Sequence, residues 1–318
     1  MSTPNQAPQP PPAERSARFL CVPNLSEGRR DDLIDQLVLA SRDPEVRLLD
    51  RTSDPDHNRT VLTLLGSADG LVRSITALVH AAFDRLDLRL HQGVHPRLGV
   101  VDVVPFVPLA GVSMRDAVQL ARRLAAQLAD AAPVFLYERA APRPERRELA
   151  AHRRGGLPKL IERMRDGSWP PDHGAATVDP ARGVLVIGAR GPLIAFNVDL
   201  DAADPAAARR IASRIRQSAP GGLRGVKALG LALPTRGVSQ VSMNVVDPSA
   251  TSLLRIVERI REEARREGVE LLASELIGLM PEQAALGALS EALGLPGLGL
   301  DKIVEHHLAA TPARATGE

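Results

Sequence analysis

The sequence VKALGLALPTRGVSQVSMNVV, residues 226–246, contains two apolar runs on either side of Pro234-Thr235-Arg236-Gly237. A proline and a glycine this close together are typical of a tight turn, and each run has the length of a strand. The segment therefore predicts a pair of strands, residues 226–233 and 238–246, around which the second half of the chain is built.

The elements on both sides of this strand pair alternate in type. A strand-like run at 193–198 and a helical pattern at 205–217 precede it, and a helical pattern at 251–267 and a strand at 269–273 follow it. The resulting order of strand, helix, strand, strand, helix, strand is ferredoxin-like.

The first half of the chain shows a similar order with extra elements. Strand-like runs occur at 19–23, 46–50, 60–65, 100–107 and 133–137, and helical spacing occurs at 33–38, 68–86 and 115–129. The pattern predicts an α/β (α+β) fold with two related subdomains. We expect each subdomain to be a mixed β-sheet with helices mainly on one face.

Changes in composition predict the domain boundaries. The expected parts are a disordered proline-rich tail at 1–17, a first subdomain at 18–183, a second subdomain at 184–308 and a flexible tail at 309–318. This division assigns a strand at 184–187 to the second subdomain. The segment 138–183 is rich in Arg, Pro and Gly, and it predicts an irregular loop at the junction, where ligands often bind.

Charge and composition exclude several classes of partner. The 318 residues include 40 basic and 38 acidic side chains, a net charge of only +2, whereas a phosphate-binding surface needs a strong positive excess. No apolar run approaches the roughly 18 residues of a membrane span. The single cysteine, Cys21, is expected in the core, and no charged-then-apolar leader opens the chain. We therefore predict a cytoplasmic protein that binds neither nucleic acid nor a membrane.

Common catalytic motifs are missing from the sequence, among them the Walker A loop, a GxGxxG loop after a strand and the GxSxG elbow. His91 and His95 are four residues apart, a spacing that could hold zinc on a helix. Gly93 and Pro96 oppose a helix there, and Gln92 stands where an HExxH motif needs glutamate. We therefore expect no metal site.

Two polar segments stand out against the apolar strands. Residues 53–59, SDPDHNR, precede a strand and form either an Asx-rich turn or part of a site. His95, Arg97 and Asp102 lie on a loop that leads into the next strand, which is either a structural loop or a proton-transfer centre. The residues alone leave these alternatives open.

Six longer motifs carry a family resemblance. They are VPNLSEGR from Val22, SDPDHNRTVLTLLG from Ser53, HQGVHPRLGVVDVVPFVP from His91, LIAFNVDL from Leu193, QVSMNVVD from Gln240 and SELIGLMP from Ser274. In their order and spread, from about residue 19 to residue 308, they resemble the formiminotransferase family. The resemblance implies transfer of the formimidoyl group from N-formimidoyl-L-glutamate to N5 of tetrahydrofolate. The products would be 5-formimidoyltetrahydrofolate and L-glutamate, in histidine degradation.

The resemblance also implies how the protein is organised. Tetrahydrofolate would be the co-substrate, no metal would be needed, and the protein would be a homodimer. Bifunctional family members carry a helical cyclodeaminase domain after the transferase. Because this sequence stops at Glu318, we expect a stand-alone transferase. Two alternatives share the motifs: a related formyl transfer between glutamate and tetrahydrofolate, and a non-catalytic folate-binding protein.

The resemblance assigns catalytic roles residue by residue. The histidine of the family's HPR motif corresponds to His95, which we expect to shuttle a proton from N5 to the leaving glutamate nitrogen. Asp54, Asp56 and Asp102 are candidate carboxylates for stabilising the protonated formimidoyl group. Animal members of the family carry a further acid at the position of Thr52, so any role of that acid would be absent here or taken over by Asp54 or Asp56.

Binding residues follow from the same motifs. We expect Asn58, Arg59 and Arg97 to bind the substrate, with the arginines as forks for carboxylates, and Arg190 to face the same cleft. The family's folate-binding loop, which precedes the LIAFN strand, corresponds to Gly174, Ala175, Ala176, Thr177, Val178, Asp179, Pro180, Ala181, Arg182 and Gly183.

Overall fold

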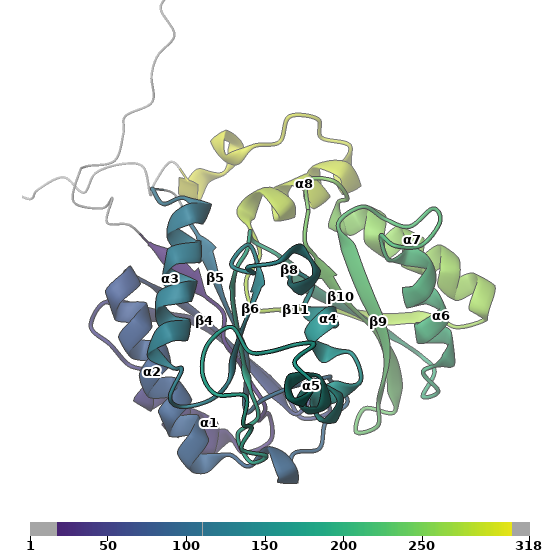
Figure 1. Cartoon of the computed structure of the whole chain (residues 1–318). Coiled ribbons are helices and arrows are strands. Elements are labelled where there is room, and N and C mark those ends of the chain that lie inside the picture. The colour runs from purple at the N-terminus through teal and green to yellow at the C-terminus, as the bar shows by residue number, and fades with distance from the viewer. Residues whose placement is uncertain (1–17, 110, 307–318) are drawn as a thin grey trace, which may run out of the picture.

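The structure is a computed structural model that describes residues 18–109 and 111–306. Two β-sheets occupy the middle of the molecule, and helices cover their outer sides (Figure 1). The tails expected at 1–17 and 309–318 lie outside the described residues. Within the described ranges, no helix is both long enough and apolar enough to cross a membrane.

The second half of the chain forms a four-stranded antiparallel sheet. Its elements are β8 (Ile194–Leu200), α6 (Ala206–Ile215), β9 (Val226–Leu233), β10 (Val238–Val245), α7 (Leu253–Glu267) and β11 (Leu271–Ile277). In space the strands lie in the order β11-β8-β10-β9. The expected strand pair and the ferredoxin-like order are confirmed. A further helix, α8 (Glu282–Leu293), follows β11.

The first half of the chain forms a seven-stranded sheet. Its strands are β1 (Phe19–Cys21), β2 (Asn24–Leu25), β3 (Val46–Asp54), β4 (Arg59–Gly66), β5 (Val101–Pro108), β6 (Val134–Glu138) and β7 (Leu185–Ala189). The helices α1 (Asp31–Ala40), α2 (Ala68–Arg85) and α3 (Met114–Gln127) belong to the same half. Both β1 and β2 pair with β4 on one side and with β5 on the other, so they act as one interrupted strand.

The two halves are related in topology. In the first sheet, β3 pairs with β4, β4 with the β1–β2 strand, and that strand with β5, all antiparallel. If the β1–β2 strand is counted as one, this is the strand order of the second sheet, and the intervening helices occur at the same places along the chain. The prediction of two related subdomains is therefore confirmed.

The strand at 184–187 was assigned to the wrong sheet. It belongs to β7, which pairs in parallel with β5 and β6 of the first sheet. Parallel neighbours are joined by long crossovers, so a strand can lie far in sequence from the strands that it pairs with. The boundary expected between residues 183 and 184 therefore separates β7 from its own sheet.

The segment 138–183 is more regular than expected, because it contains α4 (Leu149–Arg153) and α5 (Gly156–Arg165). Leu160 and Met164 of α5 are buried in an apolar cluster with Phe135 of β6 and Val186 of β7. This cluster is separate from the larger core that α2 and α3 form with the same sheet. The segment thus adds a helical layer to the first subdomain.

Alternation along β8 gives the second sheet a polar face. Phe196 and Val198 are buried in the core with α6 and α7. Successive side chains of a strand point to opposite faces, so Asn197 and Asp199 lie on the other face. Both are buried. Asp199 contacts Arg236, which also reaches Asp54, so this polar face lies against the β3–β4 turn of the first subdomain.

Candidate active site

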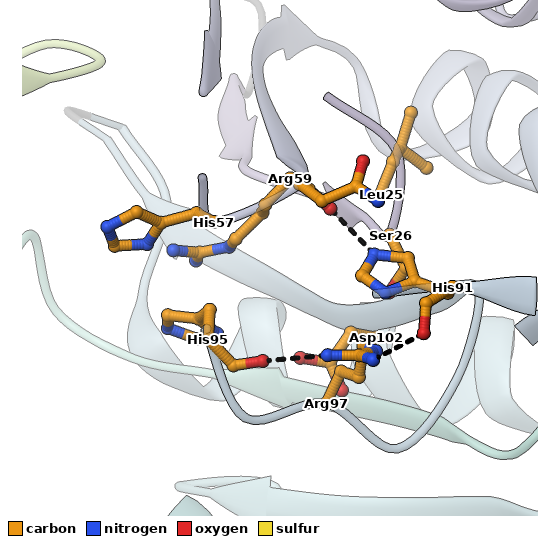
Figure 2. Close-up of a pocket in the computed structure, with 9 residues that line it drawn as sticks. Leu25, Ser26, His57, Arg59, His91, His95, Arg97 and Asp102 are labelled. Carbon is orange, nitrogen blue, oxygen red and sulfur yellow. Dashed lines mark hydrogen bonds between the residues drawn. The ribbon is translucent and has the colours of Figure 1, made fainter. Parts of the chain in front are cut away.

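Three loops of the first subdomain meet around one cavity. They are the segment before α1, the β3–β4 turn and the loop before β5. A Cβ added to Gly28 or to Gly93 would lie 2.3 Å from a backbone oxygen at the β3–β4 turn, so only glycine permits this approach. The cavity, with about 10 Å³ of space open to water, is lined by Leu25, Ser26, His57, Asn58, Arg59, His91, His95, Arg97 and Asp102 (Figure 2).

His95 presents an unprotonated nitrogen to this cavity. The residue lies in the non-helical loop before β5, where its Nδ1–H donates to the carbonyl oxygen of Pro96 at 2.8 Å. The lone pair is therefore on Nε2. Removal from water, then the guanidinium groups of Arg59 and Arg153, hold the pKa of His95 well below its usual value. The imidazole is neutral at pH 7 and can accept a proton.

Arg59, the first residue of β4, brings a positive charge to the same cavity. Its guanidinium lies near the rings of His57 and His95 and acts electrostatically on both (Figure 2). Within the described part of the chain it forms no ion pair, and its buried Nε has no hydrogen-bond partner. Burial, followed by Arg153, lowers the pKa of Arg59 to about 10, which leaves it charged at pH 7. An unpaired cation in such a place is suited to bind an anion.

His57 is a second buried imidazole in the site. Its ring centroid lies 5.8 Å from that of His95, with 30° between the ring planes. His57 Nε2 is 3.1 Å from Oε1 of Gln240 on β10. Burial lowers the pKa of His57, and nearby Asp54 opposes this shift. Sequence analysis gave His57 no role, although it lies within the SDPDHNR motif.

Asn58 and Arg97 hold the loops together. Asn58 adopts φ 47°, a conformation that Asn tolerates better than most residues. Its Oδ1 accepts from the backbone N–H of Gly28, and its Nδ2 donates to the carbonyl of Gln92. Arg97 donates to the carbonyl oxygens of His91, Gly93 and His95. These contacts give Arg97 a loop-holding role; it also lines the cavity, and the carboxylate fork expected from its motif stays a prediction.

Asp102 is also committed to contacts within the protein. Its Oδ1 accepts from the backbone N–H of Leu98 at 2.7 Å, and its Oδ2 forms an ion pair with Arg153 of α4. Asp102 thereby fixes the C-terminal end of the loop that carries His95. Arg153, which sequence analysis did not identify, brings the helical layer to the back of the site.

Asp54 and Asp56 join the two subdomains. Asp54 Oδ1 accepts from the backbone N–H of His57 at 2.7 Å, and Oδ2 lies 3.3 Å from Arg236. Asp56 Oδ1 accepts from the backbone N–H of Thr235 at 2.9 Å, whereas the buried Oδ2 has no partner among the described residues. Of the candidate carboxylates, Asp56 therefore keeps a free oxygen.

The β9–β10 turn and the polar face of the second sheet complete the site. Arg236 donates to Asp199 at 3.0 Å and lies 3.8 Å from Glu275 of β11, in addition to its contact with Asp54. Gln240 Nε2 donates to Asp199 at 2.9 Å and to Glu275 at 3.4 Å. A signal for these residues was present in the sequence, because Arg236 lies in the turn and Gln240 is a polar residue on a buried strand.

Thr52, the position that carries an acid in animal members of the family, also bridges the subdomains. Its hydroxyl lies 2.9 Å from Asp50 Oδ2 and accepts from the backbone N–H of Gly278, just after β11, at 3.2 Å. The hydroxyl therefore serves as a structural link in this chain.

The predicted folate loop, residues 174–183, lies beside the loop of His95. Gly183 forms an isolated bridge with Gly99, and the carbonyl of Arg182 accepts from the backbone N–H of Val100 at 3.0 Å. No residue of the loop lines the cavity. The loop leads into β7, and the LIAFN strand is the next strand, β8. Arg190 likewise does not line the cavity and donates to the carbonyl of Gly191.

The two histidines considered as a zinc pair are each engaged with a carbonyl. His91 Nε2–H donates to the carbonyl of Asn58 at 2.7 Å, and His95 Nδ1–H donates to that of Pro96. Across residues 18–109 and 111–306, no group of three or more His, Cys, Asp or Glu side chains could hold a metal ion.

A free guanidinium beside a neutral imidazole can bind an anion and move a proton, so the site has the character of an acid–base enzyme. The model of the N-terminal subdomain of the formiminotransferase domain matches residues 18–190, and the model of the formiminotransferase domain matches residues 195–291. The chain belongs to the formiminotransferase family. The resemblance drawn from the six motifs is confirmed.

Individual relatives support the same assignment. A glutamate formimidoyltransferase from Streptococcus pyogenes is 40% identical over 91% of this chain and 97% of the relative. One from Thermoplasma acidophilum is 40% identical over 91% of this chain and 96% of the relative. The formimidoyltransferase-cyclodeaminase of Rattus norvegicus is 38% identical over 84% of this chain but only 51% of its own length.

Proposed function

We propose that this protein is a glutamate formimidoyltransferase, which moves the formimidoyl group of N-formimidoyl-L-glutamate to N5 of tetrahydrofolate and releases L-glutamate. Its membership of the family and the names of its relatives support this function. The observation that carries the proposal is the pairing of Arg59, a cation with no partner among the described residues, with the neutral base His95 in one cavity.

The reaction needs one proton to move from the attacking nitrogen to the leaving nitrogen. N5 attacks the amidine carbon, and the carbon–nitrogen π pair moves onto the amidine nitrogen. N5 then carries a surplus proton, which Nε2 of His95 accepts. The bond to the glutamate nitrogen breaks as that nitrogen receives a proton, and His95 returns to its neutral form. No covalent bond to the enzyme is required.

Arg59 is the group suited to hold a carboxylate of the glutamate donor. A fork-shaped guanidinium binds a carboxylate through two parallel hydrogen bonds, and Arg59 has its donors free for this. Around Gln240, the partner of His57, the carboxylates of Asp54, Asp199 and Glu275 surround the cation Arg236, and Asp56 accepts from the backbone N–H of the neighbouring Thr235. We propose that this negative side stabilises the protonated formimidoyl group. Asp102 is not proposed to stabilise this group, because its charge is already neutralised by the ion pair with Arg153.

Tetrahydrofolate is proposed to bind along residues 174–183. This loop is hydrogen-bonded to Gly99 and Val100, just after the HPR motif, so a folate on it would lie next to the loop of His95. No metal takes part in the proposed reaction, and chelation with EDTA should leave the rate unchanged.

The proposal is tested by direct assay. Purified protein is mixed with tetrahydrofolate and N-formimidoyl-L-glutamate, and both L-glutamate and 5-formimidoyltetrahydrofolate are measured, with each substrate omitted in turn as controls. Equal amounts of both products are expected. Faster turnover with N-formyl-L-glutamate would favour the related formyl transfer. Folate binding without turnover of either donor would favour a non-catalytic binding protein.

The family resemblance extends to assembly and location, which we propose to be a homodimer in the cytoplasm, without nucleic acid. Light scattering on a sizing column should give about twice the mass of 34.0 kDa of one chain. Salt-dependent retention on immobilised DNA or RNA would contradict the last part of this proposal.

A further inference from the structure

The ring of His57 is fixed by a chain of hydrogen bonds from the second subdomain. Gln240 donates through Nε2 to the carboxylates of Asp199 and Glu275, so its Oε1 must face His57. An amide oxygen only accepts, so the proton that it receives comes from Nε2–H of His57. The lone pair of neutral His57 is therefore on Nδ1.

His57 and His95 then stand as a matched pair in one cavity. Each ring uses one nitrogen to donate to a fixed protein oxygen, of Gln240 or of Pro96, and keeps the other nitrogen as a lone pair. The ring centroids are 5.8 Å apart, and both rings line the cavity together with Arg59 (Figure 2). Among the described residues, no group donates to Nδ1 of His57.

We propose that His57 is a second catalytic residue, which delivers the proton to the leaving glutamate nitrogen after His95 has removed it from N5. This inference rests on the proposed function. The proton passes from N5 to Nε2 of His95, then through the amino group of the tetrahedral intermediate or a water to Nδ1 of His57. It passes last to the glutamate nitrogen, as the carbon–nitrogen bond breaks. Both rings end neutral, so the cycle balances.

The charges around the two rings give this transfer its direction. His57 faces Asp54 from its own turn and Glu275 from β11, both of which favour its protonated form, whereas Arg59 disfavours it. His95 faces Arg59, Arg153 and His57, all of which oppose a positive charge. A proton accepted by His95 therefore gains stability by moving to His57. Gln240 acts as a positioning residue, because it fixes which nitrogen of His57 is free.

The first test replaces His57 by asparagine and measures kcat and KM for both substrates across pH. If His57 carries the proton, kcat should fall about 10²-fold, the lower range for loss of a general acid, with KM changed less than threefold. Because both rings must start neutral, the acid limb of the wild-type kcat profile should depend on two protons, and that of His57→Asn on one. His80→Asn, an exposed histidine of α2, is the matched control.

Three results would overturn the proposal: a kcat of His57→Asn within twofold of the wild type, a reduced kcat with an unchanged acid limb, or a one-proton limb in the wild type. The last measurement needs no variant, so it decides the matter even if His57→Asn does not fold. Absence of transfer by the wild-type protein would instead reject the proposed function itself.

A double-mutant cycle with Gln240 tests the positioning of the ring. Gln240→Leu should reduce kcat about tenfold in the wild-type background and should have little effect in the His57→Asn background. ¹⁵N spectra of the histidine rings should show the Nε2–H form of His57 in the wild type and a mixture of both forms in Gln240→Leu. Equal loss of kcat in both backgrounds would contradict the role given to Gln240.

Discussion

Arg59 is costly to the folded protein without a ligand. It is a partly buried cation with an unpartnered Nε and without an ion pair in the described ranges. Removal of a charge from water normally requires a partner to compensate for the lost hydration. The lowered pKa of Arg59 reports the same penalty. A carboxylate that binds here would supply the missing partner, so part of the binding energy comes from relief of this penalty.

We therefore expect Arg59→Met to fold normally and to bind N-formimidoyl-L-glutamate more weakly. The loss of a charge-assisted contact in the cavity should raise KM for N-formimidoyl-L-glutamate by 10-fold or more, with a smaller effect on tetrahydrofolate. Thermal denaturation should give an equal or higher Tm than the wild type, because the unpaired charge is gone. Arg73→Met, at an exposed position on α2, is the control. An unchanged KM for the donor would contradict the assignment.

The low pKa of His95 predicts how the reaction depends on pH. The ring must be neutral to accept a proton, and the neutral form prevails above its pKa. Because burial, Arg59 and Arg153 hold that pKa well below 6.5, kcat/KM should stay level from pH 8 to below 6.5 and fall only at lower pH. In Arg59→Met the pKa of His95, followed by NMR, should rise. A decline that begins above pH 6.5 would contradict this prediction.

Elements with a clear hydrophobic periodicity were predictable from the sequence. The sheet to which a strand belongs was not, where its pairing strands lie far away in the chain. The pattern of α2 places Leu71, Ile75 and Leu78 on one buried face, and the strands β9 and β10 are separated by a recognisable turn. The sheet to which β7 belongs depends on parallel pairing with β5 and β6, which leaves no local mark. For α5 the signal existed, since Leu157, Leu160 and Met164 recur at helical spacing, but Arg, Pro and Gly around it favoured a loop.

At this scale Leu78 should be a main contributor to stability. It is fully buried between α2 and the first sheet. Leu78→Ala should lower the free energy of unfolding by about 2–5 kcal/mol, the range for a leucine deleted from a core. Leu39→Ala on α1, where the leucine is 59% exposed, should change it by less than about 0.5 kcal/mol. Urea denaturation measures both, and similar losses would contradict the described packing.

At the scale of the whole molecule, the site combines contacts within one turn with contacts that form only when the two subdomains pack together. The neighbours Asp54, Asp56 and Asn58 were predictable, because one turn brings them together. The contact between His57 and Gln240 spans 183 positions of the chain and depends on how the two subdomains dock. No periodicity or motif encodes that docking. The sequence could therefore identify His95 and Arg59 as candidates. Arg236 and Gln240 stand out in it as polar residues, but their place against His57 and the β3–β4 turn could not be predicted.

Arg236 is the cation that links the polar face of the second sheet to the β3–β4 turn. The space in the cavity that is open to water is about 10 Å³, far below the roughly 300–1,000 Å³ of most ligand sites, so two substrates require the site to widen. Without Arg236, the carboxylates of Asp54, Asp199 and Glu275 would repel one another across the cleft.

We expect Arg236→Ala to open the cleft. Amide hydrogen exchange should increase in the β3–β4 turn and in β10, and kcat/KM should fall, while the cores exchange as before. Because Arg236 is partly exposed, the change in Tm should be small. Arg209→Ala, at an exposed position on α6, is the control. Unchanged exchange at the turn would show that other contacts keep the subdomains together.

The helical layer also carries a built-in optical reporter. Trp169 is the only tryptophan in the sequence, and its indole N–H donates to Nδ1 of the buried His152 at 3.1 Å. The Cζ atoms of Arg146 and Arg163 each lie 5.0 Å from the centroid of the indole ring. From the same short helix as His152, Arg153 reaches Asp102 behind the catalytic loop. The fluorescence of this single indole therefore reports, without any added label, whether the helical layer of α4 and α5 stays in place when substrates bind and products leave.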